Sequence, residues 1–260
     1  MKFLIMTDLE GAAGVDSFSQ TRTTDEAMKR PGMKQLALET NACVEGIRAV
    51  YPDAEVDVID GHGNGGLYPE DLRGCRYIRY GKDFPHHSLP DYTALLYVGQ
   101  HAMAGTIDAP LCHTYSSLRV QYYRLNGVYI GEFAAFAQWA GMHGVPTIFL
   151  AGDDKAALEA RMFIPDIETA VTKVGTGLES AEHLSSADAC RAIREGSERA
   201  VRRIGQFTPY LRFKAPFTFE ARNYDPIANP DALSGKPGYL LVDDRTYRIE
   251  TSDYRQLPFF

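Results

Sequence analysis

Two acidic residues follow the first apolar run of the 260-residue chain. Residues 3–6 (Phe-Leu-Ile-Met) predict a buried strand, and Asp8 and Glu10 come directly after it. Alternate residues of an extended chain point to the same side, so both carboxylates are expected to face one point. Two buried carboxylates are unfavourable unless positive charge lies between them, and a divalent metal ion would supply that charge.

Further candidate ligands lie just after later predicted strands or at the start of a helix: His62, His101 and Glu132. Ligand-binding groups of α/β proteins gather at the carboxyl ends of strands, so we expect these three to converge with Asp8 and Glu10. A mixed imidazole and carboxylate set suits zinc, manganese or cobalt better than calcium. Five ligands exceed the three of a typical catalytic zinc, and a carboxylate such as Asp8 could bridge two metals about 3.5–4 Å apart.

Each candidate also has an ordinary structural explanation. Asp8 could cap a helix, and Glu132 would favour the dipole of the helix that it opens. His113, twelve residues beyond His101, could transfer a proton or stabilise a transition state, or it could be a structural histidine at a strand start. Cys112 has no predicted partner to activate it as a nucleophile, so a packed thiol is favoured there. The shared position of the candidates at element ends favours the metal site.

Residues 61–66 (Gly-His-Gly-Asn-Gly-Gly) offer a rival interpretation. They follow a predicted strand and match the G-x-G-x-x-G pattern of dinucleotide-binding loops. That pattern requires a helix immediately afterwards, whereas Pro69 and an irregular stretch follow here. A nucleotide-binding oxidoreductase therefore stays an alternative with a poor structural context.

The elements expected to position these residues alternate between strand and helix. A strand at 2–7, a helix at 32–50 and a strand at 55–60 predict a parallel crossover unit. We predict an α/β fold with a mostly parallel central sheet flanked by helices, and a smaller C-terminal α+β portion. The further predicted elements are strands at 93–98, 147–151, 168–174, 212–220, 239–242 and 246–251, helices at 131–139, 154–162 and 185–204, and a hairpin that turns at 126–127.

The pattern of predicted elements changes after residue 165. We predict a metal-binding α/β domain over residues 1–165 and a C-terminal α+β subdomain over 166–260, which could also form one domain. The strand at 212–220 alternates apolar and polar residues and contains Pro216, which favours a place at a sheet edge.

Composition bounds the possible partners. The chain is 45% hydrophobic and 23% charged, which is typical of globular proteins. Its net charge of −7 and the lack of a basic tract argue against nucleic acid and anionic membrane as partners. No apolar run approaches the ~20 residues of a membrane-spanning helix. Four scattered cysteines and the absence of a signal-peptide pattern predict a cytoplasmic location.

Taken in order, the candidate residues resemble the zinc-dependent D-aminopeptidase family, whose members are encoded with dipeptide-transport systems. The resemblance is carried by residues 7–11, 60–62, 99–102, 112–113, 131–132, 150–154 and 219–224.

The resemblance implies a metallo-aminopeptidase that releases N-terminal D-amino acids from short peptides. It also implies assembly as a decamer of stacked pentameric rings. His113 would be the catalytic histidine, as acid or base, oxyanion donor or nucleophile. Two zinc ions per chain would be bound by Asp8, Glu10, His62, His101 and Glu132.

The chain departs from the family pattern at three places. Gly61 and Cys112 stand where serines are expected, and residues 254–260 stand where an apolar C-terminal helix is expected. Two alternatives of other classes stay open beside the peptidase. They are a binuclear metallophosphoesterase and a non-catalytic peptide-binding component of a transport system.

Overall fold

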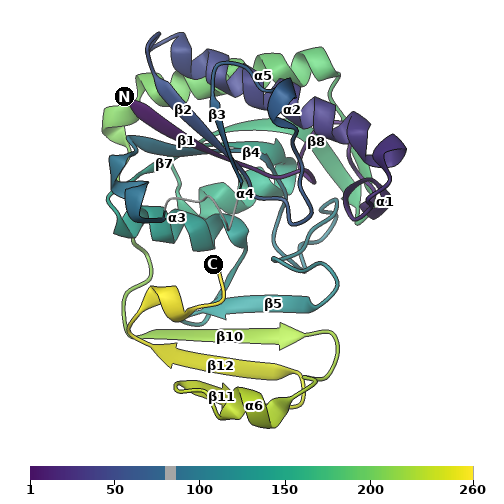
Figure 1. The fold of residues 1–260 in the computed structure, drawn as a ribbon, viewed down its shortest axis with the longest axis vertical. Helices are drawn as coiled ribbons and strands as arrows, with labels where there is room; N and C mark the ends of the chain where they lie inside the picture. Colours follow the sequence, from purple (N-terminus) through teal and green to yellow (C-terminus); the bar gives the residue numbers. More distant parts are fainter. Residues whose placement is uncertain (80–85, 260) are drawn as a thin grey trace.

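A computed structural model describes residues 1–79 and 86–259 of the chain, which form two sheets and the helices packed on them (Figure 1). The larger sheet has seven strands in the order β3-β2-β1-β4-β7-β8-β9, and only the β8–β9 pair is antiparallel among them. The predicted α/β fold with a mostly parallel sheet is confirmed. The bounds are β1 (Lys2–Thr7), β2 (Glu55–Asp60), β3 (Arg76–Arg79), β4 (Ala94–Gln100), β7 (Thr147–Asp153), β8 (Glu168–Gly177) and β9 (Ser180–His183).

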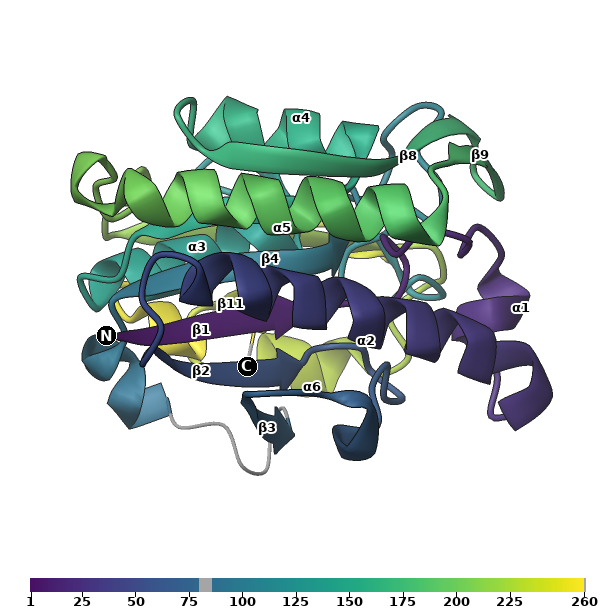
Figure 2. The same ribbon diagram turned by 90° about the horizontal axis from the view of Figure 1, so that it is seen from above.

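Helices cover both faces of this sheet (Figures 1 and 2). The helices α2 (Glu26–Arg48) and α5 (Ser186–Arg202) lie on one face, and α3 (Glu132–Met142) and α4 (Asp154–Phe163) lie on the other. Alternate residues of β1 enter the two cores, so Phe3 packs with the α2 and α5 side while Leu4 packs with the α3 side. Burial on both faces explains why the first strand reads as a continuous apolar run rather than an alternating one.

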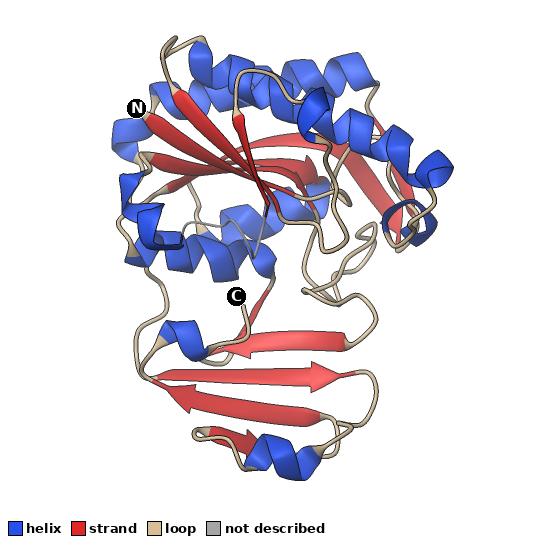
Figure 3. Ribbon diagram, viewed as in Figure 1, coloured by secondary structure: helices blue, strands red, loops and turns tan. Residues whose placement is uncertain are grey.

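The smaller sheet is antiparallel and lies beyond α3 (Figure 3). The hairpin predicted at 126–127 is confirmed, because Asn126 and Gly127 adopt positive φ angles of 47° and 82° between two paired strands. The sheet consists of β5 (Val120–Leu125), β6 (Val128–Ile130), β10 (Phe217–Asn223), β11 (Tyr239–Leu241) and β12 (Thr246–Thr251), in the order β11-β12-β10-β5-β6.

Two element predictions are wrong. β10 lies inside its sheet between β12 and β5, because Pro216 precedes the strand and removes no hydrogen bond from its ladders. Helix α2 begins at Glu26 rather than near residue 32. Asp25 caps its start by accepting a hydrogen bond from Ala27 N, and Pro31 lies within the helix.

The two sheets do not divide the chain at residue 165. Strands β8 and β9 extend the larger sheet, while β5 and β6 from the first part of the chain complete the smaller one. The division into a 1–165 domain and a 166–260 subdomain stays a prediction, and the two sheets share one apolar cluster through Phe133, Phe219 and Ile249.

The remaining helical segments are short. In the part of the chain that is described, no helix combines the length and the apolar character needed to cross a membrane. The C-terminal segment forms a single 3₁₀ turn rather than the apolar helix expected from the family pattern, and Phe260 lies outside the described residues. These segments are α1 (Phe18–Thr21), α6 (Pro230–Ser234), η1 (Pro69–Asp71), η2 (His86–Asp91), η3 (Ile204–Gln206) and η4 (Tyr254–Gln256).

Candidate metal centre

Three neighbouring strands bring the predicted ligands to one edge of the larger sheet. Asp8 and Glu10 follow β1, His62 follows β2, and His101 follows β4. The chain passes from β1 to β2 on one side, and β4 adds to β1 on the other side. The ligands therefore meet at a switch point of the strand order, where parallel sheets open a crevice.

A close backbone approach fixes the first ligand beside β4. Asp8 N donates a hydrogen bond to Val98 O over 3.0 Å. Gly99 has φ of +77°, and a Cβ atom there would lie 2.0 Å from Asp8 O. Only glycine fits this position, so the glycine before Gln100 and His101 is what allows the ends of β1 and β4 to meet.

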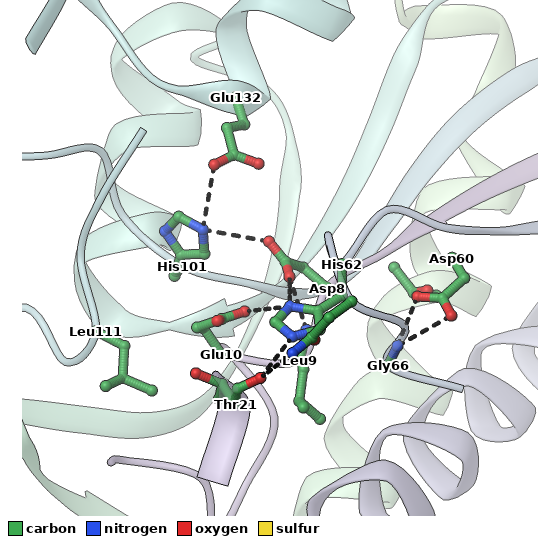
Figure 4. A network of polar contacts seen from close by, with 12 residues as sticks. Asp8, Leu9, Glu10, Thr21, Asp60, His62, Gly66, His101, Leu111 and Glu132 are labelled. Carbon is green, nitrogen blue, oxygen red and sulfur yellow. Dashed lines mark hydrogen bonds and ion pairs between the residues drawn. The ribbon is translucent and has the colours of Figure 1, made fainter. Parts of the chain in front are cut away.

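Asp8 lies between two histidines and turns one carboxylate oxygen to each (Figure 4). Its Oδ1 is 3.1 Å from His62 Nδ1, and its Oδ2 is 3.2 Å from His101 Nε2. The residue is 7% exposed. This is the arrangement expected of a carboxylate that bridges two adjacent cations.

Two glutamates extend the cluster on either side of Asp8. Glu10 Oε2 is 3.0 Å from His62 Nδ1, and Glu132 Oε1 is 3.6 Å from His101 Nε2. Glu132 is the first residue of α3, and its Oε1 also accepts a hydrogen bond from Tyr115 N over 2.6 Å. The structure therefore brings together all five predicted ligands.

The second ring nitrogen of each histidine has a backbone partner. His62 Nε2 donates to Thr21 O over 3.1 Å, and His101 Nδ1 donates to Ala102 O over 2.9 Å. When the ring is neutral, these partners assign the tautomer in which the nitrogen that faces the carboxylates carries a lone pair. Such backbone contacts orient histidine ligands in metal sites.

The donor atoms of the cluster suit divalent cations. Glu10 Oε2 and His101 Nε2 are buried, and their contacts are ion pairs within the cluster rather than hydrogen bonds of good geometry, so a cation would satisfy both atoms. Ligand atoms of Asp8, Glu10 and His101 lie within 4.8 Å of one another, and so do those of His101, His113 and Glu132. The two sets share His101, and the second includes His113, which is not one of the five predicted ligands.

Electrostatics point the same way. Burial by itself would lower the pKa of His62, but Glu10 and Asp8 outweigh it and raise that pKa well above its usual value. Burial would also lower the pKa of His101, but Asp8 and Glu132 outweigh it and raise that pKa well above its usual value. Burial would raise the pKa of Glu10, but His62 lowers it well below its usual value. The cluster attracts positive charge, which protons or metal ions can supply.

His113 lies directly beside the cluster. Its ring stacks on His101 with the centroids 3.9 Å apart and an interplanar angle of 16°. Its Nδ1 donates to Leu111 O over 2.8 Å, and its Nε2 is 3.8 Å from Glu132 Oε1. Burial and the neighbouring His101 lower the pKa of His113, so the ring is neutral near pH 7 and Nε2 can accept a proton.

Asp60 is a site residue that the sequence analysis missed. Its carboxylate accepts hydrogen bonds from Gly66 N over 2.9 Å and from Leu67 N over 3.1 Å, and this holds the loop that carries His62. In a dinucleotide site such amides would face phosphate, and a helix would follow. Here a carboxylate binds them and only the 3₁₀ turn η1 follows, so the dinucleotide interpretation has no support.

A buried lysine holds the loop after Glu10. Lys173 on β8 is 1% exposed. Lys173 and Glu10 are 163 residues apart in the sequence, so no local pattern predicts that they lie close together. The ammonium group donates hydrogen bonds to three carbonyl oxygens of the loop, those of Glu10, Ala12 and Val15.

Cys112 does not look like a nucleophile in the structure. Its thiol donates to Thr106 O over 3.5 Å, and burial raises the pKa of the thiol. A raised pKa leaves the thiol protonated at neutral pH, which fits the packed group that the sequence favoured.

A cavity of about 340 Å³ opens over the cluster, at the small end of the range for ligand sites. Its apolar wall includes Met6, Tyr97, Tyr115 and Phe136. The C-terminal segment supports this wall, because Phe259 stacks on Tyr115 with ring centroids 6.0 Å apart. The site can therefore hold a small molecule with one polar end at the ligands and an apolar part beside them.

The chain is similar to known proteins in sequence and in fold. A D-aminopeptidase from Bacillus subtilis (strain 168) is 29% identical over 234 residues, which cover 86% of this chain and 82% of the relative. A solved structure has a TM-score of 0.85 at 24% identity, with 98% of this chain and 93% of that one covered, so the two share a fold. That structure is the Zn-dependent D-aminopeptidase DppA from Bacillus subtilis, described as a self-compartmentalizing protease.

The sequence profile of peptidase family M55, described as D-aminopeptidase, matches residues 1–258. The match covers both sheets and every ligand of the candidate metal centre. It confirms the resemblance and the predicted enzyme class, an aminopeptidase, and it leaves the phosphoesterase and the non-catalytic binding protein without support. The chain belongs to the D-aminopeptidase family.

Proposed function

We propose that this protein removes the N-terminal D-amino acid from short peptides at a centre of two divalent metal ions, with zinc as the metal. The observation that carries the proposal is the convergence of five ligands and His113, all of which except His101 line one small cavity. The buried atoms Glu10 Oε2 and His101 Nε2, whose contacts are ion pairs within the cluster, support a cation there. The metals would be held by Asp8, Glu10, His62, His101 and Glu132.

The metal pair, when bound, supplies an activated water and an electrophile for the peptide carbonyl. The residues of this chain then have separate roles. Asp8 holds the two histidines in register through its two oxygens. The neutral His113 accepts a proton at Nε2 when water attacks the carbonyl carbon, and it returns that proton to the leaving amine as the C–N bond breaks.

The shape of the cavity underlies the proposed substrate size. The volume of about 340 Å³ and the apolar wall formed with Tyr97 and Phe136 suit one small residue beside the ligands rather than a folded protein. The preference for the D enantiomer is supported by the family to which the chain belongs.

A direct assay tests the function. Amine release from D-Ala-D-Ala and from L-Ala-L-Ala is measured for the protein as purified, after treatment with a chelator, and after zinc is added back. We expect cleavage of the D-peptide alone, lost with the chelator and restored by zinc. Cleavage that survives complete metal removal, or no cleavage by a folded and zinc-loaded protein, would contradict the proposal.

We also propose that copies of the chain assemble, as a decamer. The support is the description of the structurally similar DppA as self-compartmentalizing. Light scattering on a size-exclusion column should give about ten times the mass of one chain. A single-chain mass at micromolar concentration would contradict the assembly and leave the proposed reaction to its own test.

A further inference from the structure

Arg22 lies at the cavity that contains the metal ligands. It follows α1 directly and, together with Ser117, lines the same cavity as Asp8, Glu132 and His113. Among the described residues that line this cavity, it is the one with a permanently charged cationic side chain. The predicted metal ligands at one end of the cavity are mainly acidic. The positive charge of Arg22 therefore lies in a different part of the cavity from the predicted metal-binding end.

Contacts with Ser117 and Phe18 hold the guanidinium group of Arg22 in place, and neither residue neutralises its positive charge. Its Nε donates to Ser117 Oγ over 3.0 Å, its Nη2 approaches Ser117 O at 3.4 Å, and its Cζ lies 3.4 Å from the centre of the Phe18 ring. In the part of the chain that the structure describes, no carboxylate pairs with Arg22 and no hydrogen bond uses its Nη1. The group is oriented by a hydroxyl and an aromatic face, and its outer donors stay available to an anion.

The distance to the reaction centre fits a short peptide. The Phe18 ring neighbours both Arg22 and His113, and its centroid is 6.5 Å from that of His113. The Arg22 guanidinium is therefore at most about 10 Å from the His113 ring. One extended residue spans about 3.3–3.6 Å, so a C-terminal carboxylate one or two residues beyond the scissile bond can reach the arginine.

We propose that Arg22 binds the C-terminal carboxylate of the substrate, so that the enzyme selects dipeptides and tripeptides with a free C terminus. This inference rests on the proposed function, because the metal-binding end of the cavity fixes where the scissile bond lies. Arginine suits the task because its planar donors pair with a carboxylate more specifically than a lysine ammonium does.

Two peptides that differ only at the C terminus test this role. We would measure kcat and KM of the zinc-loaded, full-length protein on D-Ala-D-Ala and on D-alanyl-D-alaninamide, whose carboxylate is replaced by a neutral amide. The variants are Arg22→Gln and Arg22→Lys. The matched control is Arg119→Gln, which changes an exposed arginine that does not line the cavity.

We expect Arg22→Gln to lower kcat/KM for the free acid about 10–100-fold, chiefly through KM, and to change the value for the amide less than about threefold. Arg22→Lys should recover part of the loss, and Arg119→Gln should match the wild type on both peptides. An equal loss on acid and amide would show that Arg22 is merely structural, and no loss on either would also overturn the proposal.

Failure of the proposed function would be seen separately, as a wild-type protein that cleaves neither peptide. Calorimetric binding of the same two peptides would then decide the role of Arg22. Tighter binding of the acid than of the amide, equalised by Arg22→Gln, would support it. Equal binding of both peptides to the wild type would reject it.

Discussion

His113 carries the proton transfer in the proposed reaction, and it lies outside the five proposed ligands. Replacing it by alanine should lower kcat about 10²–10⁴-fold, because the leaving amine loses its proton donor. The zinc content should stay near two ions per chain, since the five ligands keep their positions. Steady-state kinetics and elemental analysis of the same preparation check both parts.

His143 offers a matched control for that substitution. It packs against Trp139, with ring centroids 4.4 Å apart, and it does not line the cavity. His143→Ala should leave kcat within about a factor of three. Loss of zinc from His113→Ala would instead make His113 a ligand, which its proximity to His101 and Glu132 also allows.

Site residues differ in how far sequence alone can identify them. Asp8, His62 and His101 follow apolar strands, and the ends of parallel strands meet, so their convergence could be predicted from the order of the elements along the chain. Asp60 is the last residue of β2, and the sequence analysis assigned it no role of its own. Lys173 acts through contacts made only after the fold brings β8 beside the loop that follows β1.

Strand β8 supports the loop that follows Glu10, a proposed metal ligand, through Lys173. The substitution Lys173→Met should leave three buried carbonyl groups of the loop after Glu10 without their donor. We expect unfolding to become easier by on the order of 3 kcal/mol. We also expect zinc affinity to fall about 10–100-fold, because Glu10 loses its support.

Lys155→Met is the control for that change. Lys155 lies on α4, and its Nζ bonds to Asp154 Oδ2 over 2.7 Å and to Gly175 O over 2.9 Å rather than to the loop. Competition with a zinc-binding dye, at a temperature where circular dichroism shows both variants folded, compares their affinities. Wild-type zinc affinity in Lys173→Met would show that the lysine does not position the ligand.

Helix α2 contributes a buried acid whose ionisation opposes folding. Glu39 is 0% exposed, and its Oε1 accepts hydrogen bonds from Ala13 N over 2.9 Å and from Gln35 Nε2 over 2.9 Å. Burial raises the pKa of Glu39 from 4.5 to about 7. A raised folded-state pKa adds stability that is present below pH 4.5 and is lost as the pH rises to about 7.

Glu39→Gln should remove this pH dependence. Between pH 4.5 and 7 the wild type should lose about 3 kcal/mol more of its unfolding free energy than the variant does. Urea unfolding of the metal-free protein at several pH values measures the difference. The control is Glu45→Gln, which changes an exposed acid of the same helix and should keep the wild-type dependence of unfolding free energy on pH. If Glu39→Gln showed the same pH dependence as the wild type, Glu39 would not be its source.

Element predictions succeeded where burial is continuous. The strands β1 and β2 have the predicted bounds. Strand β1 holds a continuous apolar run because both faces of the sheet are covered, and β2 was predicted from β-branched residues that alternate with acidic ones. Strands β3 and β9 were missed, since each has four residues that are largely exposed or half-buried. The start of α2 was missed because Pro31 suggests a loop, whereas the cap at Asp25 allows the helix to begin earlier.

For the whole molecule, the sequence predicted the fold class but not which strands belong to the larger sheet and which to the smaller one. The chain leaves the larger sheet after β4 to form β5 and β6, returns to it for β7, β8 and β9, and ends in the smaller sheet. Which sheet a strand joins depends on pairing between distant segments. β10, for example, pairs with β5 from about a hundred residues earlier, and no local pattern encodes such a pairing.

The cavity is lined by the carboxyl edge of the larger sheet and by the segment that precedes β5 of the smaller sheet. The larger sheet supplies the ligands at its carboxyl edge, and the wall residue Tyr115 is backed by Phe259 from the C-terminal segment. The departure from the apolar C-terminal helix expected of the family therefore places an aromatic residue behind the site. The candidate metal centre and the wall of its cavity therefore depend on both ends of the chain.

Crystals of the protein soaked in zinc, with diffraction recorded on both sides of the zinc absorption edge, test the central claim most directly. We predict two anomalous peaks about 3.5–4 Å apart. Asp8 should lie between them, with Glu10, His62, His101 and Glu132 around them and His113 outside their coordination. A single peak at this cluster, or peaks bound by other residues, would contradict a two-metal centre formed by these five ligands.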